Sequence, residues 1–239
     1  MNNTELDTED WYKKYTERTG SNRNDVLKNP EVTFQILGFD VSILAALRSM
    51  HLESYEIKIL DVGCGSGLSF FNFLRLGFEP SMMYGIDILK DRIDEGCHRF
   101  PSINFICDDA SSIKFTDNTF DIVFEVGMFI QLTNDELSEK IASEMLRVAK
   151  PGAYIMLVDW RYSKPGHCDY KGLSKKRISN LFHVGKKSKI CGVYKGALVP
   201  PVGRFFSKNL PAAYFIAQSL FPFLVGQVAT VLQKNYSDE

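Results

Sequence analysis

From residue 56 onward, the apolar positions follow two alternating spacings. Short continuous apolar runs occur at 57–62, 83–88, 103–107, 120–126 and 152–159. Stretches in which apolar residues recur at helical spacing lie at 67–76, 90–99, 134–149 and 173–182. Runs of the first kind are typical of strands that are buried on both faces. The alternation predicts an α/β fold in which helices cover both faces of a parallel sheet.

The helix expected at 134–149 has two marked boundaries. Thr133, followed three residues later by Glu136, predicts a capping box at its start. Lys150-Pro151-Gly152 predicts its end, directly before the next strand.

The flanking segments predict additions to one domain rather than a second domain. A polar helix is expected at 10–18 and a longer helix at about 32–50, where apolar residues recur at helical spacing. Strands are expected at 189–195 and 226–234, with a helix near 212–221 that has Pro211 in its first turn. We therefore divide the chain into a helical cap at 1–52, a core at 53–160 and a C-terminal part at 161–239 with an insert at about 198–225.

Composition narrows the class of protein. A chain of 239 residues that is 45% hydrophobic can bury a full core, and its net charge of −1 gives no overall preference for nucleic acid. The five cysteines form no CxxC pair, which predicts no metal site, no disulfide framework and a cytoplasmic setting. The polar N-terminus predicts no signal peptide. The longest uncharged run, 209–233, is interrupted by prolines, which favours a buried helix and a strand over a transmembrane span.

A glycine-rich turn follows the first predicted strand. Asp61-Val62-Gly63-Cys64-Gly65-Ser66-Gly67 connects this strand to a helix whose first N–H groups are unpaired. Leu68 stands where a dinucleotide motif has its third glycine, which argues against a nicotinamide dinucleotide. Asp61 would repel a phosphate but can accept a hydrogen bond from an ammonium group. The turn favours a ligand with an amino-acid end, and a tight turn without any ligand is the alternative.

Acidic residues follow the next strands. Asp87 ends the second strand and can accept from both hydroxyls of a ribose, or it can cap the next helix. Asp108-Asp109-Ala110 ends the third strand, where a carboxylate can accept from an adenine amino group and the following N–H can meet a ring nitrogen. Because open α/β sheets bind ligands at the carboxyl ends of their strands, these positions predict one site. Its predicted cofactor-binding residues are Asp61, Gly63, Cys64, Gly65, Gly67, Asp87, Ile88, Asp108, Asp109, Ala110 and Glu125.

In this order and spacing, the motifs resemble those of the class I S-adenosylmethionine-dependent methyltransferases. The resemblance extends over about 56–160 and also includes Phe120-Asp121-Ile122-Val123-Phe124 and the run from Leu146 to Ala153. It implies a Rossmann-like, seven-stranded, mostly parallel sheet with helices on both faces. The last strand would be antiparallel, and a helical insert would lie between strands six and seven. It also implies S-adenosylmethionine as the cofactor and S-adenosylhomocysteine as the product.

Two departures from the family pattern restrict the reaction. Gln131 stands where many members carry a histidine. The Asn-Pro-Pro-Tyr-type motif and the Pro-Cys pair are absent, which disfavours amino-directed and cytosine-C5 DNA methylation.

The candidate catalytic residues follow the fifth strand, where members of the family place acceptor-binding groups. Asp159 ends this strand, and His167 lies in the loop after it. A turn-capping Asp and a solvated His are the alternatives. Near the N-terminus, Arg23 is predicted to pair with the carboxylate of the cofactor or of an acidic substrate, with a plain surface loop as the alternative.

The C-terminal third is rich in basic residues, with eleven Lys or Arg and one acid, Asp169, between residues 164 and 208. A solvated basic face, an RNA backbone and an anionic lipid-linked or glycan-linked acceptor all fit this pattern. We expect O- or N-methylation of a small-molecule, saccharide or lipid-linked acceptor by a monomer or homodimer, with peripheral membrane contact but no transmembrane span. Nucleic acid is the less favoured partner. The alternatives are an RNA- or protein-directed methyltransferase and a non-catalytic module that binds S-adenosylmethionine or RNA.

Overall fold

The computed structural model describes residues 25–236. The helix expected at 10–18 and the role expected for Arg23 lie outside the described residues. The described strands are β1 (Ile59–Val62), β2 (Met83–Asp87), β3 (Asn104–Cys107), β4 (Phe120–Val126), β5 (Ala149–Trp160), β6 (Ser188–Lys195) and β7 (Gln227–Lys234). The helices are α2 (Thr33–Ser49), α3 (Phe71–Leu76), α4 (Lys90–Arg99), α5 (Asp135–Val148), α6 (Lys175–Leu181), α7 (Pro200–Asn209) and α8 (Tyr214–Leu220). Single 3-10 turns are η1 (Pro30–Val32), η2 (Leu68–Phe70), η3 (Pro80–Met82), η4 (Pro211–Ala213) and η5 (Pro222–Leu224).

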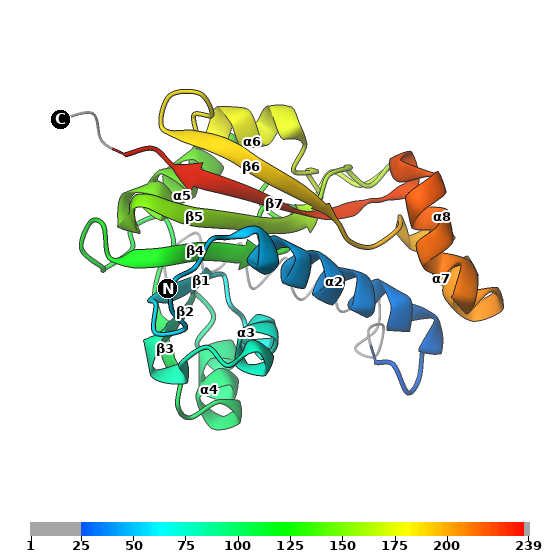
Figure 1. Cartoon of the computed structure of the whole chain (residues 1–239), viewed down its shortest axis with the longest axis horizontal. Helices are drawn as coiled ribbons and strands as arrows, with labels where there is room; N and C mark the ends of the chain where they lie inside the picture. Colours follow the sequence, from blue (N-terminus) through cyan, green and yellow to red (C-terminus); the bar gives the residue numbers. More distant parts are fainter. Residues whose placement is uncertain (1–24, 237–239) are drawn as a thin grey trace.

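The strands form one seven-stranded sheet in the order β3-β2-β1-β4-β5-β7-β6. The strand pairs from β3 to β5 are parallel, and β7 runs antiparallel to both β5 and β6. This arrangement confirms the predicted fold class, including the antiparallel last strand and the insert between strands six and seven. The insert consists of α7, η4, α8 and η5 (Figure 1).

Helices cover both faces of the sheet, as the sequence pattern predicts. On one face, α2, α3 and α4 contribute Leu47, Phe73 and Ile93 to a buried cluster. On the other face, α5 and α6 contribute Met145 and Ile178. All four residues of β1 are buried, because this strand lies near the centre of the sheet with a helical layer on each side.

The helix α2 crosses the sheet next to β6 and β7 (Figure 1). Within the described residues, the stretch Pro30–Ser49 alone is long and apolar enough to cross a membrane by length and composition. Ile43, Ala46 and Leu47 are nevertheless buried against the sheet. The apolar character of α2 therefore fits a core helix. The sequence-based prediction against a transmembrane span was made for 209–233, which does not include α2.

Three local predictions were wrong. Asn134, and not Thr133, caps α5, because the Asn134 side chain accepts a hydrogen bond from the Leu137 N–H. The strand β5 begins at Ala149 rather than at residue 152, because Ala149 pairs with Phe120. The helix α7 was not expected at all. Its two prolines occupy the first turn, where a missing N–H leaves no hydrogen bond unmade.

Candidate functional site

The glycine-rich turn is built on positive φ angles and on the Asp87 carboxylate. Gly63 and Gly67 have φ angles of +72° and +77°, a region in which only glycine is unstrained. A Cβ on Gly67 would lie 2.5 Å from the ring of Phe105, so the turn also requires close packing. Asp87 Oδ2 accepts a hydrogen bond from Gly65 N at 2.8 Å. The end of β2 therefore fixes the shape of the turn that follows β1.

The second oxygen of Asp87 is also engaged. Asp87 Oδ1 accepts from Leu89 N at 2.9 Å and closes a local turn before α4, whose N-cap residue is Leu89 and which has no side-chain cap. These bonds leave room for a ribose, because each carboxylate oxygen has two lone pairs. Burial raises the pKa of Asp87, while the two N–H donors act in the opposite direction.

The two acids after β3 have different environments. Asp108 is buried, and its carboxylate accepts from Lys114 N at 3.1 Å and forms an ion pair with Lys114 Nζ at 3.0 Å. Asp109 Oδ1 accepts from both the N–H and the hydroxyl of Ser111, each at 2.8 Å. The charge of Asp108 is therefore paired with that of Lys114, whereas Asp109 closes a local turn at the end of β3.

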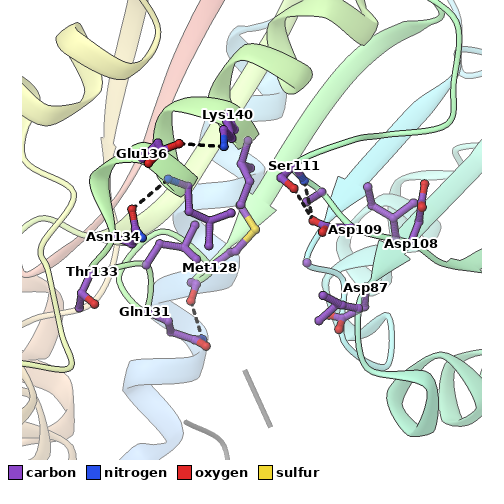
Figure 2. Close-up of a pocket in the computed structure, with 18 of the residues that line it drawn as sticks. Asp87, Asp108, Asp109, Ser111, Met128, Gln131, Thr133, Asn134, Glu136 and Lys140 are labelled. Carbon is purple, nitrogen blue, oxygen red and sulfur yellow. Dashed lines mark hydrogen bonds and ion pairs between the residues drawn. The ribbon is translucent and has the colours of Figure 1, made fainter. Parts of the chain in front are cut away.

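A cavity of about 570 Å³ lies over the carboxyl ends of β1, β2 and β4. Figure 2 shows Asp87, Asp108, Asp109 and Ser111 on one side of it, and residues of the loop after β4 and of α5 on the other. Six predicted cofactor-binding residues line it, namely Gly63, Asp87, Ile88, Asp108, Asp109 and Ala110. Five others do not, namely Asp61, Cys64, Gly65, Gly67 and Glu125. The structure thus brings the strand ends together, while the cofactor roles of all these residues stay predictions.

The residues of the second wall of this cavity were not among the predicted cofactor-binding residues, although the loop after the fourth strand was noted as a strand-end site. This wall comprises Met128, Leu132, Thr133, Asn134, Glu136, Leu137, Lys140 and Ile141. Gln131, noted only for the missing histidine, also lines it and donates to Gly127 O at 2.8 Å. The position of α5 directly after β4 was the available signal, because this helix must begin at the same edge of the sheet as the other strand ends.

Three buried carboxyl groups lie outside the cavity lining, on Asp61, Glu125 and Asp159. Burial raises the pKa of Asp61 and of Asp159 to about 7, and that of Glu125 well above its ordinary value. Ser69 donates to Asp61 Oδ2, and Met128 N donates to Glu125 Oε2. Among the described residues, neither Asp61 Oδ1 nor Glu125 Oε1 has a hydrogen-bond partner. Unpaired buried oxygens of this kind fit a further donor.

The two candidate catalytic residues are both outside the cavity lining. Asp159 Oδ2 accepts from Ile130 N at 2.7 Å, and Oδ1 accepts from Trp160 N at 2.6 Å. Asp159 therefore holds the loop after β4 in place. His167 lies in the loop after β5, with Nδ1 3.8 Å from Asp169 Oδ1. The catalytic assignment of both residues stays a prediction.

Arg177, on α6, is a second connection to the loop after β4. Its guanidinium donates to Phe129 O at 3.0 Å and to Leu132 O at 2.6 Å. It also donates to Lys171 O at 2.7 Å and to Ser138 Oγ at 2.9 Å. The sequence offered no signal for this role, because Arg177 lies in a run of basic residues that is typical of a solvated face.

The open sheet, the glycine turn and the cavity over the strand ends form a Rossmann-like arrangement, in which open α/β sheets place nucleotide-type ligands. Residues 59–152 match the family model described as "Methyltransferase domain". This match covers the core of the chain and supports its resemblance to the class I S-adenosylmethionine-dependent methyltransferases.

Curated relatives share the core rather than the whole chain. The chain is 31% identical over 105 residues to the demethylmenaquinone methyltransferase of Renibacterium salmoninarum, which covers 44% of this chain and 42% of that protein. It is 28% identical over 115 residues to phthiotriol/phenolphthiotriol dimycocerosates methyltransferase 1 of Mycobacterium ulcerans, covering 47% and 41%. The chain thus spans about two fifths of the length of these relatives. A solved structure from Pyrococcus horikoshii OT3 shares the fold, with a TM-score of 0.59 and 18% identity over 85% of this chain and 93% of that one.

Proposed function

We propose that the protein binds S-adenosylmethionine in the cavity over the strand ends and transfers its methyl group to a small-molecule, saccharide or lipid-linked acceptor, at oxygen or nitrogen. The observation that carries this proposal is the cavity itself, in which Asp87 and Asp109-Ala110 lie together at the ends of neighbouring strands. The two curated relatives described above, which are named for menaquinone and for phthiotriol lipids, support an apolar or lipid-like acceptor.

The residues present fit this cofactor. In the proposal, Asp87 accepts from the ribose hydroxyls and Asp109 with the Ala110 N–H meets the adenine ring. The unpaired Asp61 Oδ1 provides an acceptor on the side of the glycine turn, which suits an ammonium group. Arg23 would pair with the carboxylate of the cofactor or of an acidic substrate. When bound, S-adenosylmethionine supplies an electrophilic methyl group on a sulfonium.

The contribution of the chain to the reaction is chiefly positional. Holding the acceptor in line with the methyl group contributes up to about 7–11 kcal/mol in favourable systems. A hydroxyl acceptor also requires proton removal, for which His167 and Asp159 are the proposed groups. Asp159 is buried at the end of β5, and His167 lies in the loop that follows this strand. The proposed setting is the cytoplasm, which fits the five free cysteines.

Isothermal titration calorimetry with S-adenosylmethionine and S-adenosylhomocysteine tests cofactor binding. The wild-type protein should bind both at micromolar level, and Asp87→Ala should weaken binding at least about a hundredfold, because two hydrogen bonds to a charged group are lost. Asp94→Ala is the matched control, because Asp94 is an exposed acid that pairs with Lys90 on α4. Asp87→Asn serves as a second variant if Asp87→Ala does not fold.

Two outcomes would contradict the proposal at different levels. Retained affinity in a folded Asp87→Ala protein would remove the ribose assignment. Failure of the wild-type protein to bind either ligand would remove the proposed function.

A radiolabelled methyl-transfer assay against quinols, lipid-linked saccharides and RNA then separates the alternatives. Transfer to RNA, with binding that weakens steeply as salt rises, would favour an RNA-directed enzyme. Cofactor binding without transfer to any of these acceptors would favour a non-catalytic module.

A further inference from the structure

The insert between β6 and β7 carries six exposed large apolar side chains. We call these six residues the insert face, and they are Phe205, Leu210, Ile216, Leu220, Phe221 and Phe223. Their exposed fractions lie between 44% and 67%. Single exposed apolar residues are common on protein surfaces, whereas a group of this size within one insert is typical of a binding surface.

The fold itself does not require the insert face. The inner side of the same helices provides the packing, because Tyr214 is fully buried and its hydroxyl accepts from Leu198 N at 3.1 Å. The Tyr214 ring also lies 5.2 Å from the ring of Phe34, measured between centroids. The insert is thus anchored to α2 and to the segment directly after β6, while the six side chains of the insert face are exposed.

The insert itself carries charge of one sign, and Glu31 lies on η1, which packs against α7. Residues 170–236 contain no Asp and no Glu. The helix α7 carries Arg204 and Lys208, and neither forms an ion pair with a carboxylate among residues 25–236. An apolar surface with unpaired cations is complementary to an anionic lipid surface. A second copy fits less well, because a two-fold contact between inserts would bring Arg204 and Lys208 of both copies together, and the insert carries no carboxylate.

The insert face lies at the same end of the sheet as the cavity. Figure 1 shows α7 and α8 beyond the end toward which β4 and β5 point. The loop after β5 contacts the insert directly, since Arg161 donates to Pro222 O and the Tyr162 hydroxyl donates to Phe223 O at 3.0 Å. A partner surface that binds the insert face would therefore lie beside the edge of the sheet at which the parallel strands end.

We propose that the insert face docks the protein on an anionic lipid bilayer as a peripheral interaction. Phe205, Leu220 and Phe223 enter the interface, while Arg204 and Lys208 face the headgroups. A transmembrane anchor is not required, because α7 has 10 residues and α8 has 7, too few to cross a bilayer. If the protein also has the proposed function, docking favours a methyl acceptor that is itself held in the membrane; this inference about the acceptor rests on the proposed function.

Vesicle co-sedimentation without cofactor or acceptor tests docking independently of the proposed function. The wild-type protein should bind vesicles of phosphatidylcholine mixed with phosphatidylglycerol, and bind pure phosphatidylcholine vesicles weakly. The double variant Phe205→Ser with Phe223→Ser should lower the partition coefficient at least about tenfold, because two inserted aromatic side chains are lost. Lys208→Gln should lower it about fivefold on anionic vesicles only, and high salt should have a similar effect.

Phe71→Ser is the matched control. Phe71 lies on α3, outside the insert, and is 57% exposed, compared with 56% for Phe205. Its substitution should leave vesicle binding unchanged, and circular dichroism should show the native fold in every variant. Absence of wild-type binding to anionic vesicles would overturn the proposal, as would equal binding by the double variant. Self-association that the double variant abolishes, without vesicle binding, would assign the insert face to a second copy instead.

Discussion

Replacing Arg177 with Met should destabilise the protein and loosen one wall of the cavity. The guanidinium donates to three backbone carbonyls, those of Phe129, Leu132 and Lys171. A fourth bond reaches the hydroxyl of Ser138 on α5. One side chain thus connects α6 to the loop after β4 and to the start of α5.

The expected loss follows from these contacts. A hydrogen bond contributes about 0.5–1.5 kcal/mol net, and an acceptor left unpaired in a buried position costs about 1–3 kcal/mol. Arg177 is about half buried, and burial lowers the pKa of its guanidinium, so the charged group also carries a desolvation penalty that Met removes. The loss of four hydrogen bonds, partly offset by the removal of this desolvation penalty, predicts a decrease of about 3 kcal/mol in the free energy of unfolding.

Urea denaturation followed by tryptophan fluorescence measures this decrease. Arg177→Lys should decrease the free energy of unfolding by about half as much, because one ammonium group cannot reach four acceptors. Arg75→Met is the matched control: Arg75 is exposed in the last turn of α3 and should change stability by less than about 0.5 kcal/mol. A loss below about 1 kcal/mol in Arg177→Met would refute the assigned role of these hydrogen bonds.

Two further predictions concern the glycine turn and the acid before it. Burial raises the pKa of Asp61 from 3.8 to about 7, so the folded state binds this proton more tightly than the unfolded state, and stability falls as pH rises from about 4 to about 7. Asp61→Asn should reduce that fall in a pH series of thermal midpoints, and an unchanged slope would contradict the assignment. Gly67→Ala should lower the free energy of unfolding by about 2–4 kcal/mol, because positive φ is combined with overlap on Phe105. Gly65→Ala, with φ of +52° and nothing within 4 Å of the added Cβ, should lose only about 1–2 kcal/mol, and equal losses in the two variants would exclude the overlap.

The sheet was predictable because its strands leave a local signal. Every residue of β1 is buried, so the sequence there is an uninterrupted apolar run except at Asp61. The turn after it needs glycine for steric reasons, which produces a recognisable spacing. Asp87 could be found in the same way, because the end of a neighbouring strand must lie at the same edge of the sheet.

The helix α7 shows why the insert was harder to predict. An insert was expected at about 198–225, with a helix only near 212–221. In the structure, the two prolines of α7 occupy the first helical turn, and a Cβ at Gly203 would lie 3.3 Å from Leu198 O. Close packing against Leu198 and the Tyr214 hydroxyl, and not helix propensity, accounts for this glycine.

The two halves of the site therefore differ in what specifies them. On the strand-end side, Asp87 reaches Gly65 across 22 residues, within one strand–helix–strand unit that leaves a motif. On the other side, Arg177 reaches Phe129 across 48 residues and Tyr162 reaches Phe223 across 61. Contacts between residues so far apart in the sequence leave no motif of fixed spacing that could predict them. The acceptor should accordingly be sought by experiments on the loop after β4 and on the insert, because those segments lie outside the strand-end motifs.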